Sequence, residues 1–402
     1  MSTLTHRSPH RFADRLSGLG TEGAFAVLAE AKKLEAQGRD IIHLQIGEPD
    51  FATPANIVAK AKWALDHGYT HYTPSAGLME MRELYAQYVC QRYGVQGLTG
   101  ENVVIMPGAK PIVLLTGLAL IDPGDEVIIL DPTYPAYEGT VQLCGGVVRR
   151  LPLTEDTDFR FDHDRLRSLV SDRTKLFFLN TPQNPTGGVL TRADLDFIAE
   201  LALRHGFYVL SDEIYNRFVY EGEHASMINV PDILDNLVLL DGHSKTYAMT
   251  GWRLGLACTN VELAKRLTEL MTVANSCTAA FSQVAGAEAL LGDQREVEEM
   301  IAEFKVRRGL IMAGLTALPG ITCHMPKGAF YVFPNVKEYT ERRGRTSLDL
   351  QRILLHEYGV ACLAGTCFGP GGEGYLRLSY ANSRENITRA LERLREAFGR
   401  LA

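Results

Sequence analysis

The chain has 402 residues and a formal net charge of −7, with 46% apolar and 22% charged side chains. This length predicts one large domain or two moderate ones around a substantial core. The acidic balance disfavours nucleic acid or an anionic membrane surface as a partner. The sequence contains no run of about 18 apolar residues, so we expect no transmembrane helix.

The N-terminal stretch and the cysteines both indicate a cytoplasmic protein. The opening MSTLTHRSPHRF is polar and lacks the apolar segment of a signal peptide, so we expect residues 1–20 to form an arm. Seven cysteines are present and none forms a CxxC pair. We therefore expect free thiols in a reducing compartment and no metal site.

One pattern repeats between about residues 100 and 260: a short apolar run, a turn rich in Gly, Pro, Asn and Asp, and an amphipathic segment. The apolar runs cover 103–106, 127–130, 176–179, 207–210 and 237–240. Unbroken apolar runs are typical of strands that are buried on both faces. Their alternation with helices predicts an α/β fold with a mainly parallel sheet flanked by helices.

The segment TRADLDFIAELALRHG has the clearest helix signals. Thr191 is a suitable N-cap, and Asp194 three residues later completes a variant of the capping box. Gly206 is a suitable C-cap. We therefore expect a helix between these residues.

The C-terminal third has a different pattern. Helical periodicity covers about 283–317, short strand-like segments follow at 328–336 and 375–381, and a last helix is expected over about 384–400. This order predicts a smaller α+β domain.

The change of pattern divides the chain into three parts. We expect residues 47–289 to form a large α/β domain that binds the ligand. We expect residues 21–46 to join residues 290–402 in the small domain, with the arm preceding both.

Polar residues follow each apolar run, and ligands of open parallel sheets bind beyond the carboxyl ends of the strands. Each of these residues alone could be a solvated loop residue, a helix N-cap or a packing residue. Only their convergence at one edge would distinguish a site. In chain order they are Gly108, Ala109 and Lys110, then Tyr134, Asn180 and Asn184, Asp212 and Tyr215, and Ser244 and Lys245.

These residue types together suit one kind of ligand. A lysine amine forms a Schiff base with an aldehyde, and a carboxylate keeps a ring nitrogen protonated. An aromatic side chain stacks on a flat ring, while amides at a helix start and an arginine hold a phosphate. This set is expected for pyridoxal 5′-phosphate, which serves as an electron sink.

The motifs along the chain resemble those of class I aminotransferases of the fold-type-I pyridoxal phosphate group, and look most like the prokaryotic-type aspartate aminotransferase branch. The resemblance covers nearly the whole chain and implies a seven-stranded-type sheet. It rests on GEPDF (47–51), HYTPSAG (71–77), NPTGG (184–188), SDEIY (211–215), SKTYAMTGWRLG (244–255), KGAFYVFP (327–334) and YLRLSYA (375–381).

The resemblance implies a role for each matching residue around the cofactor ring. Lys245 matches the Schiff-base lysine, and Asp212 matches the partner of the ring nitrogen. Tyr215 matches the phenol at the ring 3-oxygen, and Tyr134 the aromatic residue stacked on the ring. Asn184 matches the amide that contacts both this oxygen and the substrate carboxylate.

The phosphate site implied by the resemblance combines Arg253 with the backbone amides of Ala109 and Lys110 next to Gly108. One departure concerns the serine that many relatives have three residues before the lysine. Gly242 stands there, so one phosphate contact is missing.

The resemblance also implies the substrate site and a partner subunit. Arg377 matches the arginine that binds the α-carboxylate, with Gly47 adding a backbone contact. An exposed arginine on an edge strand would give the same sequence pattern, because Arg377 alternates with two leucines. Tyr72 matches the tyrosine that reaches the cofactor of the neighbouring subunit, which implies a homodimer with shared sites.

We therefore expect an amino acid:2-oxo acid aminotransferase with ping-pong kinetics. The alternatives are a pyridoxal phosphate enzyme of another reaction type, such as a carbon–sulfur β-lyase, racemase or synthase, and more remotely a non-catalytic regulator. The amino donor stays open. The segment 271–283, which the resemblance places near the partner's site, has no cation for a distal carboxylate.

Two further motifs do not fit their usual context. GPGGEG (369–374) matches the dinucleotide-binding pattern but leads into a strand, whereas that pattern connects a strand to a helix. GHSKT (242–246) is only faintly similar to a phosphate-binding P-loop, because the G-K-S/T order is absent, and His243 within it receives no role.

Overall fold

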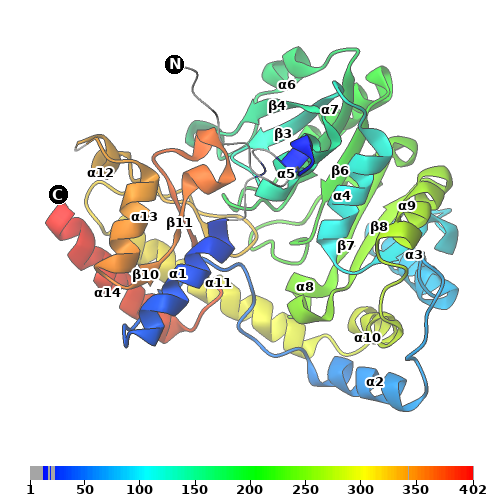
Figure 1. The fold of residues 1–402 in the computed structure, drawn as a ribbon, viewed down its shortest axis with the longest axis horizontal. Helices are drawn as coiled ribbons and strands as arrows, with labels where there is room; N and C mark the ends of the chain where they lie inside the picture. The colour runs from blue at the N-terminus through cyan, green and yellow to red at the C-terminus, as the bar shows by residue number, and fades with distance from the viewer. Residues whose placement is uncertain (1–11, 17–18, 20–22, 343, 402) are drawn as a thin grey trace, which may run out of the picture.

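The structure is a computed structural model that describes residues 12–16, 19, 23–342 and 344–401. Figure 1 shows a large sheet with helices on both sides and, beside it, a smaller part that contains both α1 and the C-terminal helix α14. The arm predicted for residues 1–20 lies mostly outside the described residues.

Within the described chain, seven strands form the large sheet, in the order β2-β8-β7-β6-β5-β3-β4. β8 runs antiparallel to both of its neighbours, β2 and β7, whereas the other neighbouring pairs are parallel. The mainly parallel α/β fold is confirmed, and the five apolar runs lie in strands except for Phe207, which directly precedes β6. The strands are β2 (Val103–Met106), β3 (Glu126–Asp131), β4 (Val147–Pro152), β5 (Thr174–Asn180), β6 (Tyr208–Asp212), β7 (Leu237–Gly242) and β8 (Gly255–Thr259).

The core lies on both faces of this sheet, because successive side chains of a strand point to opposite sides. In β3, Ile128 and Leu130 pack into one apolar cluster, while Val127 and Ile129 pack into the other. All six residues of β3 are buried. An unbroken apolar run is therefore required here, since neither face of the strand meets water.

The helices of the larger part alternate with these strands, and α7 begins and ends as predicted. The Thr191 hydroxyl accepts from the Asp194 amide in a capping box, and Gly206 ends the helix with a φ of 74°. The helices are α2 (Ala55–Asp66), α3 (Met79–Tyr93), α4 (Ala109–Leu120), α5 (Pro135–Cys144), α6 (His163–Leu169), α7 (Arg192–His205), α8 (His243–Thr246), α9 (Val261–Ala274) and α10 (Ala280–Leu291).

The smaller part contains a three-stranded antiparallel sheet, in the order β11-β12-β9, and a parallel pair of β1 with β10. Its strands are β1 (Ile42–His43), β9 (Tyr331–Val332), β10 (Val360–Ala361), β11 (Leu363–Ala364) and β12 (Leu376–Ser379). Its helices are α1 (Gly23–Ala36), α11 (Arg295–Thr316), α12 (Lys337–Glu341), α13 (Ser347–His356) and α14 (Arg384–Leu401).

The helical periodicity over 283–317 proves to be two helices. α10 ends before Gly292, and the Asp293 carboxylate accepts from the amide of Arg295 at the start of α11. A glycine followed by an aspartate is a stop signal and a start signal in succession. The predicted helical patterns are therefore present, with a break at 292–294.

The N-terminal strand β1 adds to the smaller part. Ile42 pairs with Val360, and the Ser379 amide donates to the Leu44 carbonyl at 2.7 Å. These contacts fit the proposed division in which residues 21–46 join residues 290–402.

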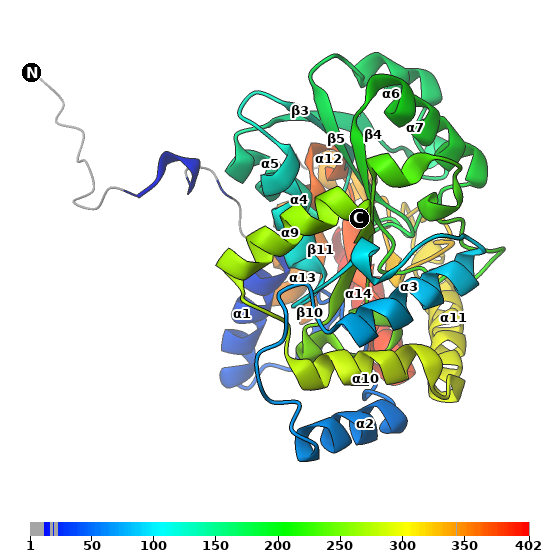
Figure 2. The ribbon, with the colours of Figure 1, turned by 90° about the vertical axis from the view of Figure 1, so that its right-hand side faces the viewer.

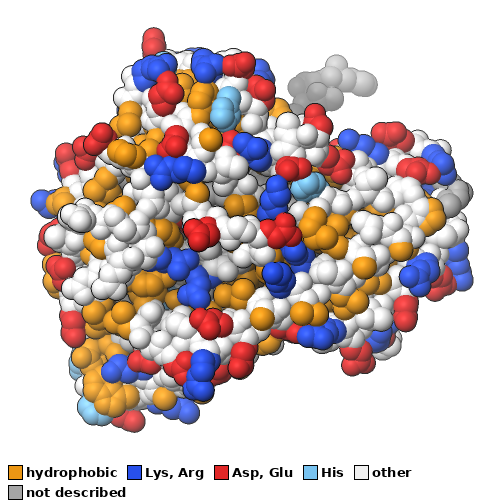
Figure 3. Space-filling view, turned by 180° about the vertical axis from the view of Figure 1, so that it is seen from behind, with side chains coloured by type: hydrophobic (Ala, Val, Ile, Leu, Met, Phe, Trp, Pro, Cys, Tyr) orange, Lys and Arg blue, Asp and Glu red, His pale blue; other side chains and the backbone are white. Residues whose placement is uncertain are grey.

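Figure 3 shows acidic and basic side chains interspersed over the back face of the molecule. No helix in the described residues is long and apolar enough to cross a membrane.

Candidate active site

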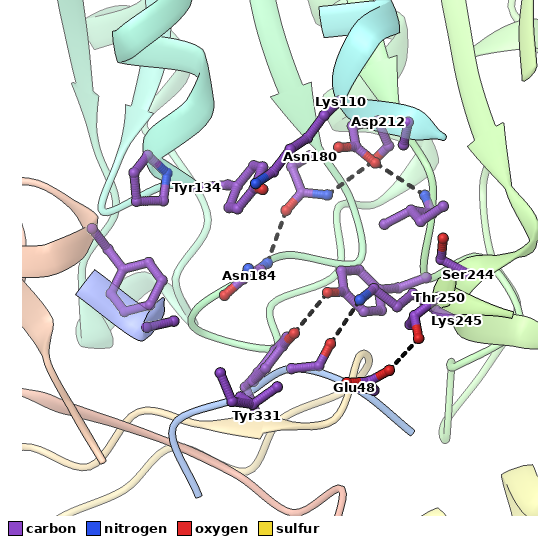
Figure 4. Close-up of a pocket in the computed structure, with 18 of the residues that line it drawn as sticks. Glu48, Lys110, Tyr134, Asn180, Asn184, Asp212, Ser244, Lys245, Thr250 and Tyr331 are labelled. Carbon is purple, nitrogen blue, oxygen red and sulfur yellow. Dashed lines mark hydrogen bonds between the residues drawn. The ribbon is translucent and has the colours of Figure 1, made fainter. Parts of the chain in front are cut away.

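A cavity of about 460 Å³ lies where the carboxyl ends of the parallel strands meet the smaller part. Figure 4 shows side chains from both parts pointing into it. The predicted site residues that line it are Gly47, Ala109, Lys110, Tyr134, Asn180, Asn184, Asp212, Tyr215, Ser244, Lys245, Arg253 and Arg377. Gly108 and Tyr72 do not line it in the described chain.

Lys245 lies in α8, directly after β7, with its amine inside the cavity. Its Nζ donates to the Gly47 carbonyl at 2.6 Å. Burial lowers the pKa of Lys245 to about 8, while the carboxylate of Glu48 and, more weakly, that of Asp212 act in the opposite direction. A charged ammonium loses hydration in such a place. The amine is therefore neutral more often near pH 7 than a surface lysine is, and can act as a nucleophile or base.

Asp212 ends β6 and lines the same cavity. The Tyr137 hydroxyl donates to its Oδ2 at 2.7 Å, and the Ile214 amide donates to its Oδ1 at 3.1 Å. Burial raises the pKa of Asp212 to about 6, although both hydrogen bonds act in the opposite direction. A buried carboxylate of this kind gains free energy from a cationic partner.

The start of α4 and the loop before β8 meet at one end of the cavity. Gly108 adopts a φ of 98°, and a side chain there would overlap the guanidinium of Arg253. A side chain at Gly255 would overlap the backbone of Gly108 and Ala109. Arg253 itself has a φ of 53°, which is uncommon for a residue with a side chain and typical of functional sites. Amides at a helix start and a guanidinium together suit an anion.

Arg377 lies on β12, the central strand of its sheet, and is 3% exposed. The alternative of an exposed edge-strand arginine is therefore wrong. Its guanidinium donates to the carbonyl of Gln45 and, at 3.3 Å, to the side chain of Asn184. Its Nε has no hydrogen-bond partner among the described residues. Burial lowers the pKa of Arg377, so a carboxylate in the cavity would relieve the cost of burying this charge.

Comparison with known proteins establishes the family of this chain. The model of the family described as aminotransferase class I and II matches residues 39–394. The chain belongs to this aminotransferase family. It is 40% identical to the aspartate aminotransferase of Pyrococcus horikoshii over 91% of this chain and 92% of that protein. It is 37% identical to aromatic-amino-acid aminotransferase 2 of Thermococcus litoralis over 89% and 92% of the two chains.

Solved structures of aminotransferases share the fold. Aspartate aminotransferase from Thermus thermophilus with maleate superposes with a TM-score of 0.91 at 36% identity, over 96% of this chain and 99% of that one. The chain is accordingly a pyridoxal phosphate-dependent transaminase of fold type I.

The described residues of this aminotransferase fit that cofactor. One cavity is lined by the buried carboxylate of Asp212, the amine of Lys245 with its lowered pKa, and the turn that carries Arg253. The glycines at 108 and 255 leave the turn open where a side chain would block it. The Tyr134 ring forms part of the wall, 5.6 Å from the Tyr137 ring.

Several residues that line this cavity were not predicted from the sequence, among them Tyr137, Tyr331 and Phe368. The Tyr137 hydroxyl donates to Asp212, and the Tyr331 hydroxyl forms a hydrogen bond with that of Tyr215. The ring of Phe368 lies 5.1 Å from the guanidinium carbon of Arg377. Tyr137 lies in the first turn of α5, three residues after Tyr134, which is the N-cap of that helix. This spacing was the available signal. No comparable signal marks Tyr331 or Phe368.

The two misleading motifs lie apart from the chemistry. GPGGEG forms 3₁₀ turns before β12 and precedes no helix. His243 is buried behind the cavity, where its Nε2 lies 3.0 Å from the Gly286 carbonyl. The relatives reported above are named aminotransferases, and neither the lyase nor the regulator alternative gains support.

Proposed function

We propose that this aminotransferase moves an amino group from an amino acid to a 2-oxo acid, with Lys245 as the residue that attaches the cofactor and carries the proton. The observation that carries this proposal is the placement of the Lys245 amine in one cavity with the Asp212 carboxylate and the Arg377 guanidinium. An amine, an acid and a cation are the three groups that the reaction requires of the protein.

The large part holds the cofactor. Pyridoxal phosphate, when bound, supplies an aldehyde that forms a Schiff base with an amine and a protonated ring that accepts electrons. Asp212 keeps the ring nitrogen protonated, since opposite charge favours the charged form. Tyr134 would stack on the ring, Tyr215 would donate to its hydroxyl oxygen, and Arg253 would bind the phosphate.

The smaller part holds the substrate. Arg377 binds the α-carboxylate through parallel hydrogen bonds, and Asn184 beside it fixes the carboxylate's orientation. Gly47 adds a backbone contact to the substrate, and its carbonyl accepts a hydrogen bond from Lys245. The α-carbon then lies within reach of the Lys245 amine.

Lys245 moves the proton. The neutral Nζ of Lys245 would act as the base that takes the α-proton of the substrate and as the acid that returns it. Because one substrate leaves before the next enters, ping-pong kinetics follow.

Substitution Lys245→Ala tests the central role. We expect the exchange of substrate α-protons with solvent to fall by about 10³-fold or more, since a positioned base contributes about 10²–10⁴. The measurement is deuterium exchange followed by NMR, with added cofactor. Exchange at the wild-type rate would contradict the proposal.

Lys110 in the wall of the cavity supports a proposal for the amino donor. Its Nζ lies 5.9 Å from the Tyr134 ring centroid and 5.6 Å from the Phe25 ring centroid. This is the cation that segment 271–283 does not provide. We propose aspartate-type dicarboxylic donors, in keeping with the names of several relatives.

A donor screen tests this choice. Lys110→Met should reduce kcat/KM for aspartate about tenfold or more, since a charge-assisted bond is lost. The same variant should change the value for alanine by less than about threefold. Equal losses for both donors would contradict a distal carboxylate contact.

We further propose a homodimer in the cytoplasm, in which Tyr72 of one subunit completes the site of the other. The seven cysteines are free thiols, which fits a reducing compartment.

A further inference from the structure

Tyr331 belongs to the motif KGAFYVFP (327–334), and none of the roles assigned so far falls on this motif. It belongs to β9, is 1% exposed and lines the cavity. Figure 4 shows Tyr331 among the side chains of the pocket, and its hydroxyl oxygen lies 2.7 Å from that of Tyr215. The hydroxyl of Tyr331 therefore touches a residue that we assign to the cofactor.

The ring of Tyr331 touches a second functional group. The guanidinium carbon of Arg377 lies 4.4 Å from the centroid of this ring and 5.1 Å from that of Phe368. A desolvated guanidinium is attracted to the face of an aromatic ring. The register of β9 against β12, with Ser379 opposite Tyr331, holds ring and cation on adjacent strands.

A third contact fixes the position of the hydroxyl. A side chain at Gly47 would overlap the hydroxyl of Tyr331, so this glycine leaves the space that the phenol occupies. The carbonyl of the same glycine accepts from Lys245. The Tyr331 hydroxyl thus lies between the acceptor of the lysine and the phenol of Tyr215.

We propose that Tyr331 is a positioning residue for both halves of the site: its hydroxyl donates to Tyr215 and strengthens the bond that Tyr215 makes to the cofactor, and its ring holds Arg377 in place for the substrate carboxylate. This inference rests on the roles proposed above for Tyr215 and Arg377. A phenol that accepts a hydrogen bond becomes a better donor, because hydrogen bonds in a chain polarise one another. The charged groups that act on the pair are Asp212 at the end of β6 and Arg377 on β12.

Two variants separate the two contacts in the holoenzyme. Tyr331→Phe removes only the hydroxyl. We expect the pH midpoint of the bound cofactor's visible absorbance to rise by about half a unit, since one hydrogen bond is weakened. The direction is upward because a weaker bond from Tyr215 disfavours the deprotonated, more negative form of the site. KM for the amino donor should stay within about twofold.

Tyr331→Leu also removes the ring. Its KM for the donor should rise about fivefold or more above that of Tyr331→Phe, because the face of the ring no longer holds Arg377. Its absorbance midpoint should equal that of Tyr331→Phe. Should the leucine variant lower the melting temperature strongly, Tyr331→Met, which is closer in volume, provides the same comparison.

Tyr380→Phe is the matched control. Tyr380 is a buried tyrosine of the same aromatic cluster, and its hydroxyl donates to the Ala329 carbonyl at 3.1 Å, away from the cavity. Neither midpoint nor KM should change in this variant. A shift as large as that of Tyr331→Phe would overturn the assignment, because it would reflect a general loosening of the cluster.

Tyr215→Phe distinguishes a failure of this inference from a failure of the proposed function. It should raise the midpoint more than Tyr331→Phe does. A midpoint that moves in Tyr215→Phe and not in Tyr331→Phe overturns the hydroxyl part and leaves the proposed function intact. A midpoint that moves in neither variant contradicts the role of Tyr215 itself. An equal KM in Tyr331→Phe and Tyr331→Leu overturns the part assigned to the ring.

Discussion

Burial shapes the charges of individual residues in this cavity. It lowers the pKa of Lys245 to about 8 and raises that of Asp212 to about 6. Both shifts favour the neutral form of the side chain, and both groups face space that a charged, flat molecule can fill. Hydrogen bonds then decide how far each shift goes, and for Asp212 the main side-chain donor is Tyr137.

Tyr137→Phe isolates this hydrogen bond. The ring stacks on Phe178 with centroids 5.2 Å apart, so the variant keeps its packing. Without the donor, the pKa of Asp212 rises further and its carboxylate stabilises a protonated ring nitrogen less well. We expect kcat to fall about five- to tenfold, which corresponds to one hydrogen bond of about 1 kcal/mol or slightly more.

The measurement is steady-state kinetics, with the affinity for cofactor determined in parallel. Tyr220→Phe is a suitable control, since that hydroxyl donates to a backbone carbonyl outside the cavity. An unchanged turnover number in Tyr137→Phe would show that Asp212 does not depend on this donor.

The residues that could be predicted from sequence are those fixed by strand ends. Asp212 and Lys245 directly follow buried runs, so their place at one sheet edge follows from the topology. Tyr331 could not be found in this way. Its partners Tyr215 and Arg377 lie on other elements, and only tertiary packing brings the three together. Lys110 was recognised for its backbone amide, whereas the direction of its long side chain depends on the surrounding wall.

Among the helices, α7 shows how an N-terminal cap contributes to the stability of the fold. Burial alone would raise the pKa of Asp194, but hydrogen bonds from Arg160, Thr191 and His163 outweigh it and bring the value down to about 2. A carboxyl with a depressed folded-state pKa stabilises the fold above its unfolded pKa. That contribution is lost as the pH falls through the folded value.

Asp194→Asn should lower the free energy of unfolding by about 2 kcal/mol at pH 7. The difference from the wild type should stay constant down to about pH 4 and shrink between pH 4 and pH 2. Urea unfolding at several pH values measures it. Asp196→Asn on the same helix breaks only an exposed pair with Arg192, and should change stability by less than about 0.5 kcal/mol. A pH-independent loss in Asp194→Asn would contradict the electrostatic origin.

The elements that escaped prediction have sequences without a clear period. β4 reads Val-Val-Arg-Arg-Leu-Pro and lies at the sheet edge, where charged side chains reach water. β8 contains Gly, Ala and Cys, whose small side chains give a weak strand signal. The sheet could be predicted from its central parallel strands, whereas its full strand order depends on contacts that no local pattern encodes.

On the surface of the molecule, two apolar side chains outside the cavity are almost fully exposed to solvent. Tyr72 is 91% exposed and Val273 is 89% exposed. Figure 2 shows the segment between α2 and α3 running beside the end of α9, and Thr272 donates to the hydroxyl of Ser75 at 2.9 Å. Exposed apolar side chains on adjoining segments mark an interaction surface. A second copy of the chain is the proposed occupant, since a homodimer would present the same surface twice.

A mixing experiment tests whether that second copy shares the site. Lys245→Ala subunits lack the amine, and Tyr72→Ala subunits lack the phenol that we assign to the neighbouring site. In a mixed dimer, one site lacks both groups and the other has both. After full exchange of equal amounts, half of the dimers are mixed, so about a quarter of all sites should be intact. Activity should therefore return to about a quarter of the wild-type value, although each parent has little. If Tyr72 served its own subunit, every site in the mixed dimer would lack one group, and mixing would restore nothing.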